Sequence, residues 1–80
     1  MPRLKQLSGA DLLTIFKQLG FAVERTRGSH VKLRRVQDGV RQTLTVPMHS
    51  RIDTGTARAV FRQALKYVPE SDLRPHFYTE

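Results

Sequence analysis

Apolar residues recur every three or four positions near the start of the chain, which is the spacing of one face of a helix. Ser8 precedes this stripe as a candidate N-cap, and Asp11 three residues later completes a capping box. Gly20 supplies a helix stop. The pattern predicts a helix over about residues 8–19. The residues of its apolar stripe are Leu12, Ile15, Phe16 and Leu19.

Three segments of β-type pattern follow. They predict strands over residues 21–26, 29–35 and 41–46. The first two strands are expected to be joined by a turn at Arg27-Gly28, and the last two by a hairpin turn at Asp38-Gly39.

Side chains alternate between the two faces of a strand, so the pattern also predicts which residues face the helices. Val31 and Leu33 should face the helices, as should Leu44 and Val46 on the next strand. A register slip of one residue would bury charged side chains at high cost, so the opposite arrangement is disfavoured. The outward set is then His30, Lys32, Arg34, Thr43 and Thr45.

A second helix is expected after a polar loop over residues 48–55. Its apolar positions predict a span of about 55–67, with Asp53 or Thr54 as the N-cap. In the tail, Pro69 fits the first position of a short helix and Pro75 is expected to end it. The fold class is α+β in the order α-β-β-β-α, with a three-stranded antiparallel sheet and both main helices on one face.

Charge favours a polyanionic partner. The 80 residues contain 14 Lys plus Arg and 7 Asp plus Glu, a formal net charge of +7. Six of the fourteen basic residues lie between Arg25 and Arg41, and arginine, which binds phosphate with two parallel hydrogen bonds, outnumbers lysine. RNA, DNA or an acidic protein would fit, and solubility alone remains an alternative reason for the charge.

Other composition features narrow the class of protein. The absence of cysteine excludes disulfides and thiolate metal sites. The N-terminus lacks the apolar run of a signal peptide, and no stretch is long and apolar enough to cross a bilayer. A cytoplasmic protein without membrane contact is expected. The three histidines lie far apart, so no metal site is expected, and no motif for a small-molecule cofactor is present.

The segment Gly28-Ser29-His30 carries the strongest candidate chemistry. Gly28 permits a tight turn, and His30 starts a strand, where its backbone is held firmly. Histidine exchanges protons near neutral pH, and the cations Lys32 and Arg34 would disfavour its charged form and stabilise negative charge on a phosphate under attack. These are the requirements of RNA cleavage by its own 2′-hydroxyl. The segment also fits a plain turn followed by a polar strand residue.

A second candidate lies before the second helix. His49 and Arg51 are placed to bind a phosphate at the helix N-terminus, or His49 to act as a second acid or base. A solvent-exposed loop histidine is the alternative. His76, in the tail, is expected to take no part in catalysis.

Several short motifs, in this order and spacing, resemble the HicA family of bacterial toxins over about residues 8–66. They are Leu19-Gly20-Phe21, Arg27-Gly28-Ser29-His30-Val31-Lys32, Thr45-Val46-Pro47-Met48-His49, Gly55-Thr56 and Val60-Phe61-Arg62-Gln63-Ala64. Two positions depart from the family pattern: Ala57 follows Gly55-Thr56, where leucine is usual, and Leu65 replaces a glycine. The whole chain, residues 1–80, would then be one HicA-like toxin domain, with a core of about 8–67 and an extension of 68–80.

The resemblance implies a function as well as a fold. HicA-like proteins are mRNA interferases with a double-stranded-RNA-binding-domain-like fold, and they cleave mRNA without an obligatory metal. Their essential histidine falls on His30. The residue pattern itself, rather than the resemblance, predicts the RNA- or phosphate-binding residues: Ser29, Lys32, Arg34, Gly28, His49 and Arg51. A HicB-like antitoxin is the expected protein partner. The alternative is a non-catalytic RNA-binding or protein-interaction module of the same fold.

Overall fold

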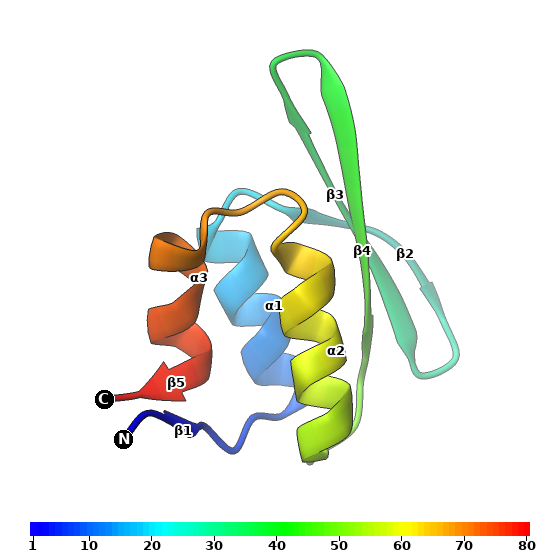
Figure 1. The fold of residues 1–80 in the computed structure, drawn as a ribbon. Coiled ribbons are helices and arrows are strands. Elements are labelled where there is room, and N and C mark those ends of the chain that lie inside the picture. Colours follow the sequence, from blue (N-terminus) through cyan, green and yellow to red (C-terminus); the bar gives the residue numbers. More distant parts are fainter.

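A layer of helices covers one face of a three-stranded antiparallel sheet in the computed structural model, which describes residues 1–80 (Figure 1). The order α1-β2-β3-β4-α2 is the expected α-β-β-β-α order of a double-stranded-RNA-binding-domain-like fold, and both of these helices lie on the same face of the sheet. The elements are β1 (Arg3–Leu4), α1 (Gly9–Gln18), β2 (Ala22–Arg27), β3 (His30–Gln37), β4 (Val40–Pro47), α2 (Thr54–Ala64), α3 (Glu70–Phe77) and β5 (Tyr78–Thr79).

Two tight turns join the strands of the sheet. Asp38 and Gly39 both have positive φ, of 54° and 77°, as a type I′ hairpin turn requires, so the predicted turn is confirmed. The first turn lies at Gly28-Ser29, one residue later than predicted. Gly28, with φ of 57°, occupies the first central position, where a type II′ turn needs glycine. This shift makes Arg27 and His30 cross-strand partners.

The register confirms the predicted faces of the sheet. Val31 pairs with Val46 and Leu33 with Leu44, and all four are buried against the helices. Lys32 pairs with Thr45 and lies on the opposite face. The strands β3 and β4 also run further than expected, and their hairpin stands clear of the helices in Figure 1.

The capping box predicted at the start of α1 is present. The Asp11 N–H donates to Ser8 Oγ over 3.0 Å, and the Ser8 N–H donates to Asp11 Oδ2 over 2.9 Å. At the other end, the Arg35 guanidinium donates to the carbonyl oxygens of Leu19, over 2.8 Å, and of Tyr67, over 3.1 Å. Because Arg35 joins the chain just beyond α1 to the chain just beyond α2, it ties both helices to the sheet.

The tail is part of the body rather than a loose extension. Phe77 is fully buried, and its ring lies 6.2 Å from that of Phe16 and 5.2 Å from that of Phe61 between centroids. Val68 and Leu73 join the same apolar core. The core therefore draws on all three helices and on the inner face of the sheet.

The end of α2 and the whole of the tail differ from the sequence prediction. The helix α2 ends at Ala64, not near residue 67, and a turn follows it. Pro69 is the N-cap of α3 rather than its first residue, and α3 continues past Pro75 to Phe77. The short strands β1 and β5 were not predicted; they pair Leu4 with Tyr78 and bring the two chain ends together.

The two edges of the sheet differ in how open they are. Gln63 of α2 closes part of the β4 edge, because its side-chain amide accepts from the Thr45 N–H at 2.9 Å and donates to the Thr45 carbonyl at 3.2 Å. Every residue of β2, at the other edge, is exposed.

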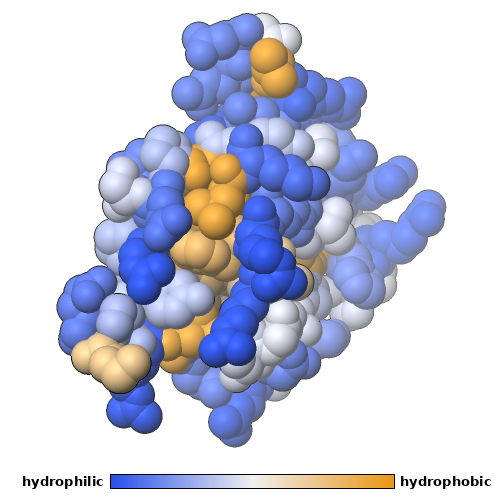
Figure 2. All heavy atoms as spheres, viewed as in Figure 1, coloured by the Kyte–Doolittle hydropathy of each residue, from blue (hydrophilic) through white to orange (hydrophobic).

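The helical face carries apolar patches between hydrophilic side chains (Figure 2). The β3–β4 hairpin exposes Val36 and Val40 beyond the body. None of the helices combines the length and the apolar character that crossing a bilayer requires.

Candidate active site

His30 is the first residue of β3, on the face of the sheet that points away from the helices. Its cross-strand partners are Arg27 on β2 and Pro47 on β4. The imidazole is exposed and takes part in no side-chain hydrogen bond. The backbone is held on both sides by the sheet, while the side chain is free to meet a ligand.

The segment Pro47–His49 is packed beside this histidine. The Met48 N–H donates to the Ser29 carbonyl over 2.6 Å, and the Gly9 N–H donates to the His49 carbonyl over 2.8 Å. A Cβ added at Gly9 would lie 2.6 Å from both Met48 Cα and the Pro47 carbonyl oxygen, so only glycine fits there without a shift. These contacts bring Ser29, His30 and His49 to one end of the molecule, at the first turn of α1.

His49 lies close enough to Asp53 to affect its ionisation. Asp53 caps α2 by accepting the Thr56 N–H at 2.7 Å, and this hydrogen bond is the largest cause of its lowered pKa; the charge of His49 adds a smaller effect in the same direction. A phosphate at this helix N-terminus would meet the Asp53 carboxylate. Arg51 points elsewhere: its Nε donates to Gln6 Oε1 over 3.1 Å.

Lys32 and Arg34 share the face of His30, as expected, but neither is a free cation. Glu24 lies between them, 3.7 Å from Lys32 Nζ and 3.7 Å from Arg34 Nε. Arg41 Nη2 donates to the same carboxylate. That hydrogen bond is the main cause of the lowered pKa of Glu24, and the charges of all three cations add to it.

The contacts of Glu24 with these cations were not predicted from the sequence, because the position of its side chain depends on a break in the regular pairing of β2. The register between β2 and β3 shifts between Val23 and Arg25, which is the mark of a β-bulge at Glu24. Because the bulge breaks the alternation of side chains between the two faces of β2, the sequence pattern did not predict which cations Glu24 contacts.

Arg25 and Arg27 are the other cations on this face, and sequence reasoning did not single them out. Arg25 is the cross-strand partner of Lys32, and Arg27 is the partner of His30. Both are exposed and neither has an acidic partner within ion-pair distance. The useful signal was the glycine at position 28, since a turn starting there places Arg27 opposite His30.

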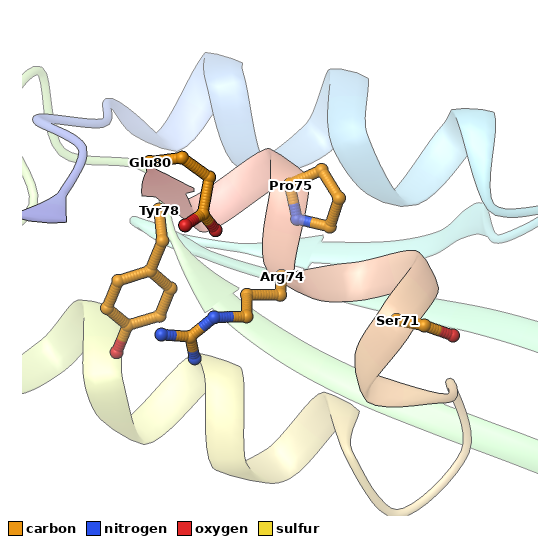
Figure 3. Close-up of a pocket in the computed structure, with 5 residues that line it drawn as sticks. All are labelled: Ser71, Arg74, Pro75, Tyr78 and Glu80. Atoms are coloured by element: carbon orange, nitrogen blue, oxygen red, sulfur yellow. The ribbon is translucent and has the colours of Figure 1, made fainter. Parts of the chain in front are cut away.

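The surface also has a pocket, and none of the candidate site residues lines it. It has a volume of about 420 Å³ and is lined by Ser71, Arg74, Pro75, Tyr78 and Glu80, around α3 and β5 (Figure 3). The Arg74 guanidinium already lies 4.5 Å from the centre of the Tyr78 ring, and Arg74 Nη1 lies 3.6 Å from Glu70 Oε2. No three His, Cys, Asp or Glu side chains are grouped in the structure as metal ligands.

Comparison with known families agrees with the resemblance found in the motifs. A family model described as the HicA toxin of bacterial toxin–antitoxin systems matches residues 9–65. Searches of curated proteins and of solved structures gave no match. The matched range contains α1, the three-stranded sheet and α2. The chain belongs to the HicA toxin family of bacterial toxin–antitoxin systems.

Proposed function

We propose that this toxin is an mRNA interferase, an endoribonuclease that needs no metal ion and uses His30 as its acid/base residue. The observation that carries the proposal is the position of His30. It stands exposed at the rigid start of β3, on a basic face of the sheet, in a chain of the HicA family. An exposed site suits this small domain, because a long polymer has to lie across it.

The reaction is an attack of the RNA on its own backbone. Neutral His30 takes the proton of a 2′-hydroxyl, the 2′-oxygen bonds to the adjacent phosphorus, and the bond from phosphorus to the next 5′-oxygen breaks. The departing 5′-oxygen receives a proton from His49 or from water. The products are a 2′,3′-cyclic phosphate and a free 5′-hydroxyl, and positive side chains around the phosphorus stabilise the charge that builds up.

Residues around His30 have supporting roles in this proposal. The Gly28-Ser29 turn lets the RNA backbone approach closely, and the Ser29 hydroxyl orients either the substrate or His30. Lys32 and Arg34, which Glu24 holds in place, stabilise the negative charge that develops on the phosphate. His49 is proposed to bind phosphate on the loop before α2, and Arg51 can join it there only by leaving its hydrogen bond to Gln6.

The protein partner is proposed to be a HicB-like antitoxin with an acidic contact surface. The outward face of the sheet carries Arg25, Arg27, Arg34 and Arg41, so an acidic protein would be attracted to the same surface as RNA. Bound there, it would cover His30. A purified complex should therefore cleave RNA far more slowly than the free toxin, and equal rates would contradict this mode of inhibition.

The test of the activity uses purified protein and single-stranded RNA in the presence of a chelator. Cleavage that yields 2′,3′-cyclic phosphate ends, and that stops when the 2′-hydroxyl is replaced by hydrogen, is the expected result. Salt-sensitive RNA binding without cleavage across neutral pH would instead favour the non-catalytic RNA-binding module.

A further inference from the structure

We infer that the RNA backbone runs along the edge strand β2, with Arg25 and Arg27 binding consecutive phosphates beside His30. The inference rests on the proposed function, because it assigns a binding track for that RNA substrate. It differs from the sequence-based expectation, in which Lys32 and Arg34 were the main phosphate contacts.

The geometry of the sheet places these two arginines next to the reacting group. Arg27 is directly opposite His30 in the antiparallel register, so both side chains leave the same face of the sheet with Cβ atoms about 5 Å apart. Arg25 is two residues along the same strand, which puts its side chain on that face about 6.6 Å further on. This spacing is similar to the distance between successive phosphates of an extended RNA strand.

Arg25 and Arg27 differ from the other cations of this face because they contact no acidic side chain. Lys32, Arg34 and Arg41 all contact the one carboxylate of Glu24. A phosphate that binds there must displace Glu24 or sit beside its negative charge. A phosphate that binds Arg25 or Arg27 displaces only water, since no acidic group contacts either one. A guanidinium free in this way can hold a phosphate with two parallel hydrogen bonds.

Access to β2 is also better than access to the opposite edge. All six residues of β2 are exposed, and no further strand covers its outer edge. At the β4 edge, Gln63 already bonds both the N–H and the carbonyl of Thr45. A strand of RNA can therefore follow β2 without moving any other element.

The experiment measures RNA affinity separately from cleavage. Every variant is made in a His30→Ala background, so that the RNA stays intact, and binding of a fluorescent single-stranded RNA is followed by anisotropy at several salt concentrations. The variants are Arg25→Gln, Arg27→Gln and Arg34→Gln. The matched control is Arg3→Gln, which removes the same charge from an exposed position on β1, away from the sheet.

Arg25→Gln and Arg27→Gln should each weaken binding by about threefold or more and lower the slope of log affinity against log salt by about one unit, as expected for one lost phosphate contact. Arg34→Gln should have a smaller effect, and Arg3→Gln the smallest. In a Glu24→Gln background the effect of Arg34→Gln should grow to match that of Arg27→Gln, because Arg34 is then free of its carboxylate.

The inference is overturned if Arg34→Gln weakens binding as much as Arg27→Gln while Glu24 is present, or if the two β2 variants behave like Arg3→Gln. Far-UV circular dichroism checks that each variant is folded. Cleavage by the chain with His30 intact distinguishes the two claims: absent cleavage with the expected order of affinities refutes only the proposed activity, while cleavage with the wrong order refutes only the β2 track.

Discussion

Any side chain at Gly9 is expected to destabilise the fold, and the substitution Gly9→Ala tests how tightly α1 is packed against the active-site segment Pro47–His49. The new Cβ would lie 2.6 Å from Met48 Cα, 2.6 Å from the Pro47 carbonyl oxygen and 3.1 Å from the His49 nitrogen. These are backbone atoms, so no side-chain rotation relieves the clash. The segment is also held by the hydrogen bonds from Gly9 to His49 and from Met48 to Ser29.

The size of the effect follows from two opposing contributions. Forcing an extra carbon into a well-packed site costs about 1–3 kcal/mol. Replacing glycine by alanine restricts the unfolded chain and returns about 0.4–1 kcal/mol where the native backbone suits alanine. A net loss of about 1–2 kcal/mol in the free energy of unfolding is expected for Gly9→Ala.

Gly55 provides a matched control, because it too lies in the first turn of a helix. A Cβ there would meet only Asp53 Oδ1, at an ordinary contact distance of 3.5 Å. Gly55→Ala should therefore leave stability unchanged or raise it by up to about 1 kcal/mol. Urea unfolding followed by circular dichroism measures both variants. If Gly9→Ala proves as stable as Gly55→Ala, the conclusion that α1 packs too closely on Pro47–His49 to admit a side chain at Gly9 is refuted.

Two further predictions concern the tail and the charged face. Phe77→Ala should destabilise the fold by about 3–5 kcal/mol in urea unfolding, because the ring is fully buried between Phe16 and Phe61; a loss below about 1 kcal/mol would mean that the tail does not complete the core. Glu24→Gln should reduce stability at neutral pH. The folded pKa of Glu24 lies below its ordinary value of 4.5, so the ionised carboxylate stabilises the fold above that pH, and this contribution is lost as the pH falls through the folded pKa. The stability difference between wild type and Glu24→Gln should therefore vanish on acidification, and a difference that persists or grows in acid would contradict the ion-pair cluster.

The parts of the fold that local rules govern were predictable from the sequence. The capping box of Ser8 and Asp11 sets the start of α1 within a single turn, and the Asp38-Gly39 turn needs only two residues that accept positive φ. The alternation of Val31 and Leu33 with charged residues fixed the faces of β3, because a slip would bury charge.

The parts that were not predictable depend on contacts between distant residues. Pro75 lacks an N–H and is typical of a helix end, yet α3 continues to Phe77, whose ring is buried in the core. The strands β1 and β5 are two residues each, too short for a pattern, and they form because the chain ends meet, as in the hydrogen bond from the Lys5 N–H to the Phe77 carbonyl.

The candidate site shows the same division. The outward position of His30 followed from alternation and is confirmed, and its catalytic role stays a prediction. The turn was predicted at Arg27-Gly28 and lies at Gly28-Ser29 instead. This difference of one residue decides whether Arg25 or Arg27 is the cross-strand partner of His30. In the structure the partner is Arg27, and Ser29 in the turn accepts a backbone hydrogen bond from the Met48 N–H.

The catalytic role of His30 is tested most directly by kcat/KM for cleavage of a single-stranded RNA, compared between His30→Ala and His76→Ala. Both variants remove one imidazole, but His76 lies on α3, away from the sheet. A general acid/base typically contributes about 10²–10⁴-fold to the rate, so His30→Ala should lower kcat/KM by at least about 100-fold while His76→Ala stays near wild type. Wild-type cleavage by a folded His30→Ala variant would contradict the account.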